Sequence, residues 1–309
     1  MTDVYRRPWP ARGATAAAPV VVLGAPSPLR SAVARSLGGP ATPAACLDSP
    51  DQLRRALADG DAAGPGGPGA GALAGGAVVL ATVPRLPGLA GALAYRFRPR
   101  ALAASFEQAL LAARSHGVAR VIVLSTAFRY ADDGGTALRP GSPTLAAPET
   151  AAAAAAEAAA GLFSRLGGDS VVLRLGWTCG PEEAVTRRVL SAARRGWRLI
   201  DADPDSWVCL VAEEDAAHAV RPAMTSPPGT YNVTDGRPLT AGALNALLQE
   251  AAGQALHGLD DPRWGWAGAL FGHSRRVAGP DLPGWQPEVT PTAGRLAALL
   301  AGGRAASER

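Results

Sequence analysis

The sequence contains no lysine, and all thirty of its basic residues are arginine. A guanidinium keeps its proton at ordinary pH, so the chain has neither a Schiff-base amine nor a lysine that could tune a neighbouring acid. No apolar run approaches the roughly 18–20 residues that span a bilayer, and no apolar stretch follows the N-terminal arginines. We therefore expect a cytoplasmic protein with no secretory signal and no membrane partner.

Cysteine and histidine are also scarce. The three cysteines lie far apart at positions 46, 179 and 209, and the four histidines at 116, 218, 257 and 273 lack the spacing of metal ligands. The sequence predicts neither a disulfide framework nor a metal site, and it predicts three reduced thiols.

The net charge of +4 is spread along the chain. The densest arginine pairs, at 187–188 and 194–195, fall on one expected helix without interleaved aromatic residues. A solvated helix face explains such pairs better than a nucleic-acid surface, so no nucleic-acid partner is predicted. The same face could attract a phosphorylated substrate.

Short apolar runs alternate with helical patterns over the first 180 residues. The expected strands are 19–24, 44–48, 77–82, 120–125 and 170–175, and the expected helices are 28–37, 101–116 and 149–166. Continuous apolar strands that alternate with helices indicate a parallel sheet covered on both faces. The predicted fold class is therefore α/β, a doubly wound, Rossmann-like parallel sheet.

The chain divides into three expected parts. Residues 1–18 are expected to form a loose arm, and residues 19–180 the Rossmann-like nucleotide-binding domain. The regular alternation weakens after Gly180, so residues 181–309 are expected to form a smaller mixed α/β region that caps the carboxyl edge of the sheet, interleaved with the first domain. Ligands of open α/β folds bind at that edge.

Four segments carry a family resemblance when they are taken in order. They read VVVLGAPSPLR at 20–30, VIVLSTAFRY at 121–130, PETAAAAAAE at 148–157 and VVLRLGWTCGP at 171–181. Together they resemble the NAD-dependent epimerase/dehydratase group of the extended short-chain dehydrogenases/reductases. The resemblance implies an NAD or NADP cofactor, a small-molecule substrate and a homodimer paired through helices, for which the alanine-rich face at 150–160 is suited.

The first segment stands where the family has a strand, GxxGxxG and a helix. Gly24 matches the first glycine, but Ser27 and Arg30 replace the other two, whose lack of a side chain leaves room for pyrophosphate and for helix packing. Arg30 could add a charge beside a phosphate at the helix N-terminus, or it could point into solvent beside a closed loop. Asp48 could hold a ribose hydroxyl or serve an ordinary turn, and Thr82 completes the candidate cofactor residues.

The second segment resembles the family's strand end with its catalytic hydroxyl. Thr126 falls at that position and is a candidate catalytic residue that would hydrogen-bond a substrate carbonyl or hydroxyl. Tyr130 follows where the family has Val-Tyr-Gly and is a candidate substrate contact.

The third segment departs from the family's Pro-Tyr-x-x-x-Lys-x-x-x-Glu pattern. Pro148 and Glu157 agree with it, but Glu149 replaces the tyrosine and Ala153 the lysine. The proton route that the resemblance would imply is therefore missing. Glu149 is the candidate acid, since a carboxyl at an apolar pocket can have a raised pKa; the helix dipole alone also favours a glutamate there. Glu157 is expected to face solvent.

The fourth segment supplies two further candidate substrate residues. Arg174 matches the family pattern, and Trp177 stands where asparagine is usual. Trp177 would either narrow the substrate pocket or belong to the core.

Three functions remain open on this reading. The preferred one is an atypical NAD(P)-binding oxidoreductase or epimerase-type enzyme of specialised metabolism that does not use Tyr and Lys. The second is a cofactor-independent enzyme of dehydration, cyclisation or isomerisation, and the third an inactive ligand-sensing or partner-binding scaffold, which predicts a cleft plugged by side chains.

Overall fold

A computed structural model describes residues 20–38, 45–58, 75–81, 99–132, 134–145, 147–258 and 265–307. The expected arm at 1–18, most of the glycine-rich stretch at 59–76, and Thr82 lie outside these residues.

Six parallel strands form the central sheet, in the order β10-β5-β4-β3-β1-β2. Their bounds are β1 Val20–Leu23, β2 Ala45–Leu47, β3 Ala77–Ala81, β4 Arg120–Thr126, β5 Asp169–Leu175 and β10 Gly229–Val233. The order turns back beside β1, which is the arrangement of a doubly wound sheet. The predicted fold class is confirmed.

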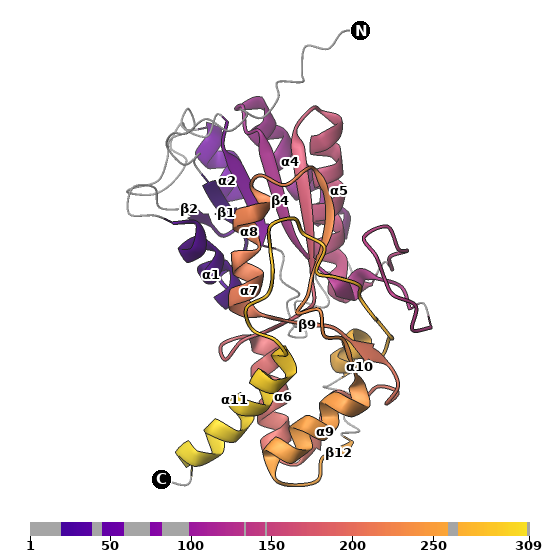
Figure 1. Cartoon of the computed structure of the whole chain (residues 1–309). Coiled ribbons are helices and arrows are strands. Elements are labelled where there is room, and N and C mark those ends of the chain that lie inside the picture. The colour runs from indigo at the N-terminus through magenta and orange to yellow at the C-terminus, as the bar shows by residue number, and fades with distance from the viewer. Residues whose placement is uncertain are drawn as a thin grey trace.

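Helices cover both faces of this sheet (Figure 1). On one face lie α2 (Pro50–Ala58), α4 (Pro99–Ser115) and α5 (Ala151–Arg165), and on the other α1 (Pro28–Leu37), α7 (Glu213–His218) and α8 (Val220–Ala223). The strands β3 and β4 are buried along their whole length because both faces are covered.

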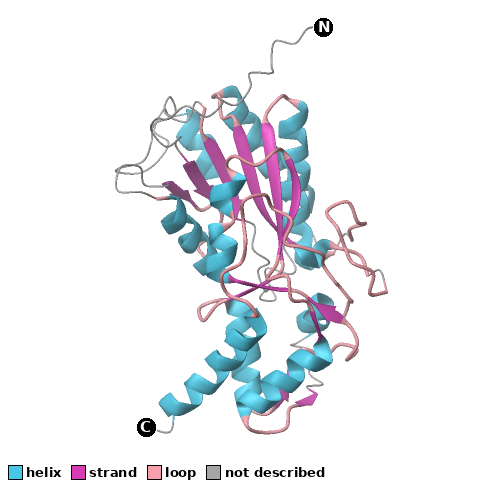
Figure 2. Cartoon of the chain, viewed as in Figure 1, coloured by secondary structure: helices cyan, strands magenta, loops and turns pink. Residues whose placement is uncertain are grey.

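The C-terminal half adds a second layer of helices beyond the carboxyl edge of the sheet (Figure 2). It contains α6 (Ala184–Arg194), α9 (Ala241–Ala252), α10 (Gly265–Phe271) and α11 (Thr292–Ser307). Short strand pairs, separate from the central sheet, accompany these helices: β6 (Trp177–Cys179) with β9 (Leu210–Ala212), β8 (Trp207–Val208) with β11 (Leu239–Thr240), and β7 (Trp197–Arg198) with β12 (His257–Gly258). Its core is separate from the two cores on the faces of the sheet.

The alanines of α5 pack inside the chain. Ala153, Ala156 and Ala160 are buried, and α5 lies against α4 and β4. Small side chains therefore bring α5 close to its neighbours in the same molecule, which accounts for the alanine-rich face without a second copy. No helix in the described part of the chain is long and apolar enough to cross a membrane.

Candidate functional site

A pocket opens at the carboxyl ends of β4 and β5, between the sheet and the C-terminal half. Its walls come from five places: the first turn of α1, the ends of the two strands, the 3₁₀ helix after β4, the segment from 176 to 185, and α10. The lining residues are Leu29, Leu124, Ser125, Thr126, Phe128, Leu175, Gly176, Trp177, Thr178, Glu183, Val185 and Leu270. This is the edge at which open α/β sheets bind ligands.

Thr126 lies in this pocket as the last residue of β4. Its hydroxyl oxygen accepts a hydrogen bond from the backbone N–H of Phe128 at 3.2 Å, which begins a short 3₁₀ helix at Ala127–Arg129. The residue is 2% exposed. The bond fixes the hydroxyl at the strand end and leaves its proton able to bond a ligand oxygen.

Trp177 forms an aromatic wall with two residues that sequence reasoning did not single out. Its ring meets Phe271 edge-on at 5.0 Å between centroids, and Phe271 meets Phe128 in the same way at 5.6 Å. The wall lies between the main pocket and a smaller one, which His273 and Arg275 help to line. The indole nitrogen of Trp177 is buried without a hydrogen-bond partner among the described residues.

Glu183 is the pocket's acidic residue, and sequence reasoning missed it. The residue is 6% exposed, and its Oε1 has no hydrogen-bond partner among the described residues. Burial raises the pKa of this carboxyl to about 7, the negative charge of Glu213 adds to the rise, and the backbone of Leu29 and Ala184 offsets part of it. A carboxyl of that pKa can give or take a proton near neutral pH. Its sequence signal was slight, a second glutamate after Gly-Pro.

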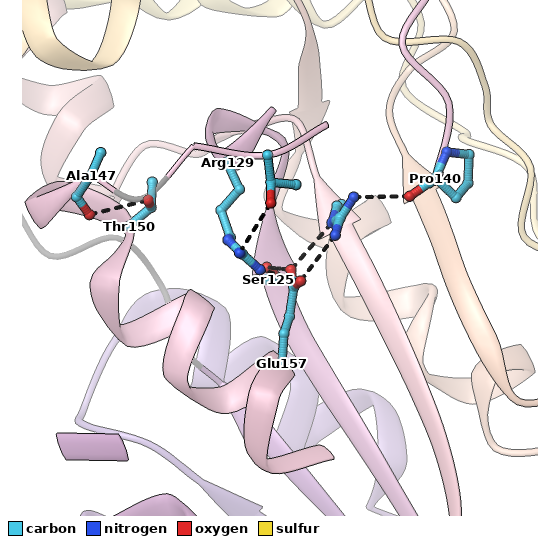
Figure 3. A network of polar contacts seen from close by, with 8 residues as sticks. Ser125, Arg129, Pro140, Ala147, Thr150 and Glu157 are labelled. Carbon is cyan, nitrogen blue, oxygen red and sulfur yellow. Dashed lines mark hydrogen bonds and ion pairs between the residues drawn. The ribbon is translucent and has the colours of Figure 1, made fainter. Parts of the chain in front are cut away.

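Behind the pocket, Glu157 joins two arginines (Figure 3). Its carboxylate accepts from Ser125 Oγ and Arg129 and forms a bidentate pair with Arg174 at 3.2 and 3.0 Å. Its side chain is only 12% exposed, so the expectation that it faces solvent is wrong. Burial alone would raise the pKa of Glu157, but the bonds from Arg174 and Ser125 and the two positive charges hold it below its ordinary value.

Arg174 and Tyr130 belong to this buried network and do not line the pocket. Arg174 also donates to the carbonyl of Pro140 at 3.0 Å and lies over the Tyr130 ring, 4.8 Å from its centroid. Tyr130 is fully buried and donates its hydroxyl proton to Asn232 Oδ1 at 2.6 Å. Of the three substrate residues predicted, the structure places only Trp177 in the pocket.

The loop expected to hold the dinucleotide makes its bonds within the chain. A Cβ on Gly24 would come within 2.5 Å of the Ala81 carbonyl oxygen, so packing against β3 already requires glycine there. The Arg30 guanidinium bends back to the Gly24 carbonyl at 2.7 Å and to Asp48 at 2.5 Å. Two predicted cofactor residues, Arg30 and Asp48, therefore pair with each other, and Arg30 does not point into solvent.

The amides at the start of α1 can be accounted for one by one. Pro28 has no N–H, the Arg30 amide donates to Ser27 Oγ at 3.1 Å, and the Ser31 amide donates to the Ser27 carbonyl. The backbone of Leu29 lies near the Glu183 carboxylate and lowers its pKa. A pyrophosphate in the usual pose would lie against this carboxylate.

Glu149 sits in a 3₁₀ turn at Pro148–Thr150, is partly exposed, and is not among the residues lining the two pockets described above. This turn packs against α10, which forms one wall of the main pocket. The catalytic role of Glu149 stays a prediction.

A third carboxylate, Asp215, serves the fold. Its side-chain oxygens accept the backbone N–H groups of Glu288 and Val289 at 3.0 and 2.9 Å. His218 and Glu288 lie close enough to share a cation with it, but the buried carboxylate is already used to hold the C-terminal loop.

Solved structures resemble the chain over almost its whole length. UDP-glucose 4-epimerase of Thermus thermophilus, solved with NAD, has 20% identity and a TM-score of 0.69 and covers 91% of this chain and 98% of its own. The dTDP-glucose 4,6-dehydratase DesIV of Streptomyces venezuelae, with NAD and TYD bound, has 19% identity and a TM-score of 0.68 over 93% and 98%. RMD of Pseudomonas aeruginosa, complexed with NADPH, has 20% identity and a TM-score of 0.63 over 93% and 98%.

The chain has the fold of the epimerases and dehydratases of nucleotide sugars. The resemblance inferred from four short segments is thus confirmed at the level of the fold. No family model matches the chain, and no curated protein matches it significantly in sequence.

Proposed function

We propose that this protein is an NAD(P)-binding enzyme of the oxidoreductase or epimerase type that acts on a small metabolite without a Tyr–Lys pair. One observation carries the proposal. In a fold shared with dinucleotide-bound enzymes, a pocket at the carboxyl edge holds a fixed hydroxyl, Thr126, and a buried carboxyl, Glu183.

The residues fit a dinucleotide in part. Gly24 and the N-terminus of α1 stand where the fold places a pyrophosphate, and a bound nicotinamide would supply hydride chemistry. The fit requires Glu183 to move or to lose its charge. Binding would also compete with the Arg30–Asp48 pair.

Residues of the chain itself would perform the other parts of the reaction. The Thr126 hydroxyl would donate to a substrate oxygen, and Glu183 would exchange a proton with the substrate. The wall of Trp177, Phe128 and Phe271 would exclude water on one side. Glu157, held by its arginines, would keep the end of β4 in place through Ser125.

A cofactor-independent enzyme is the second candidate. The observation in its favour is that the first turn of α1 has its amides occupied by groups of the same chain. Dehydration, cyclisation or isomerisation would then use Thr126 and Glu183 alone.

Calorimetric titration with NAD(H) and NADP(H), with a check for nucleotide that copurifies, tests the proposal. Micromolar binding is the expected result, and Thr126→Val should then lower turnover of any substrate found while Thr126→Ser preserves it. If neither NAD(H) nor NADP(H) binds at any pH, the proposed oxidoreductase function is wrong and the cofactor-independent enzyme remains.

A further inference from the structure

The first turn of α1 already faces an anion from its own chain. The backbone of Leu29 lowers the pKa of the Glu183 carboxyl, and both residues line the main pocket. A helix N-terminus attracts negative charge, and here the carboxylate lies beside the place that a ligand phosphate would take.

That carboxylate is poorly satisfied. Its Oε1 is buried without a partner among the described residues, in contrast to the carboxylate of Glu157 with its two arginines. An ionised carboxyl without a counter-ion is costly to bury, so the site favours the protonated acid.

The charged groups around Glu183 do not relieve this cost. Glu213, from α7, faces it with the same charge, and Cys179, from β6, is a buried thiol whose pKa burial raises well above the ordinary value. The arginines nearby, Arg35 of α1 and Arg295 of α11, act on Glu213.

We propose that the diphosphate of a dinucleotide binds the first turn of α1 only when the buried Glu183 beside it is protonated, so that ligand binding above neutral pH takes up one proton. The inference rests on the proposed function, because it needs a dinucleotide to bind. It adds that Glu183 sets the affinity for the dinucleotide and the dependence of this affinity on pH.

The direction of the effect follows from linkage. An anionic ligand prefers the protein whose Glu183 is neutral, so affinity is highest below the pKa of about 7. Above it, affinity should fall by up to about tenfold per pH unit, because one proton must be bound before the ligand.

Calorimetry with NAD is the test, because the diphosphate of NAD keeps its charge across this range. Titrations of the full chain at about pH 6 and about pH 8.5, each in two buffers of different ionisation enthalpy, give both affinity and proton uptake. Wild type should bind roughly tenfold or more weakly at the higher pH, with uptake approaching one proton. Glu183→Gln should bind at both pH values as wild type does at the lower one.

Glu182→Gln is the matched control. Glu182 is the neighbouring glutamate, its side chain is 74% exposed and it pairs only loosely with Arg187. This variant should keep the wild-type dependence on pH and the wild-type proton uptake.

The outcomes separate the two proposals. If NAD binds wild type with no proton uptake, or if Glu183→Gln keeps the dependence on pH, the role of Glu183 is wrong and the proposed function stands. If neither wild type nor Glu183→Gln binds dinucleotide at either pH, both fail. Circular dichroism establishes that each variant is folded.

Discussion

Two buried carboxylates close to the same sheet edge have opposite surroundings. Glu157 meets Ser125, Arg129 and Arg174, and these contacts keep its pKa below the ordinary value in spite of burial. Glu183 meets no cation among the described residues, and burial raises its pKa to about 7. A buried charge with its counter-ions belongs to the architecture, whereas one without them is a group that a ligand can complete.

The largest expected effect comes from breaking the satisfied carboxylate. Glu157→Ala leaves Arg129 and Arg174 buried without their partner, and we expect a loss of about 3–5 kcal/mol in the free energy of unfolding. Urea denaturation measures it. Because its folded pKa is lowered, the Glu157 contribution should be present at neutral pH and be lost as the pH falls below 4.5. A loss under about 1 kcal/mol would mean that the network contributes no more to stability than an exposed ion pair does.

Removing the charge of Glu183 should have the opposite effect on the free energy of unfolding and stabilise the folded protein. Its pKa is raised from 4.5 to about 7, so in that window the folded state holds a proton that the unfolded state has lost. Stability should therefore fall as the pH rises through the window, by on the order of 3 kcal/mol at about 1.4 kcal/mol per pKa unit.

The variant Glu183→Gln should remove this fall and should be more stable than wild type at about pH 8. Urea denaturation across the pH range, with Glu182→Gln as the control that keeps the wild-type profile, measures the difference. Equal stability of Glu183→Gln and wild type at every pH would mean that the carboxyl is solvated in the folded protein.

The sequence predicted the scaffold well because its signals are local. The apolar runs of β1, β3, β4 and β5 and the helical pattern at Pro28–Leu37 lie close to where they were expected. The helical pattern at 213–223 predicts one helix, but this segment forms two, α7 and α8, because Pro222 has no N–H for the His218 carbonyl.

The site was less predictable because its contacts join distant residues. Glu157 follows a run of alanines and reads as a solvent-facing helix position, yet its partner Ser125 is 32 residues away. Glu183 meets Leu29 only because the segment after β6 returns to the first turn of α1. Family spacing drew attention to Glu149, which lies at the equivalent position in the sequence but outside the pocket.

A smaller effect on stability is expected at Tyr130, with no effect on ligand binding in the pocket. Tyr130→Phe removes the 2.6 Å hydrogen bond to Asn232 Oδ1 and should cost about 1 kcal/mol in stability. Dinucleotide affinity should not change, since Tyr130 is fully buried behind the site. Thermal unfolding and calorimetry test the two parts, and a change in affinity would return Tyr130 to the candidate substrate residues.

The smallest effect on stability is expected at the Arg30–Asp48 pair, where consequences for binding should be clearer than for folding. Asp48 is 54% exposed, so Asp48→Asn should cost under about 1 kcal/mol. Without its partner, Arg30 of α1 would be able to turn to a ligand phosphate, and a guanidinium beside the end of β2 suits a ribose 2′-phosphate. We expect the affinity for NADPH to rise relative to that for NADH, and fluorescence titration measures both affinities.

Asp51→Asn is the control, because Asp51 pairs with Arg54 on the exposed side of α2. Equal ratios in both variants would mean that Arg30 stays bound to the Gly24 carbonyl and closes the loop.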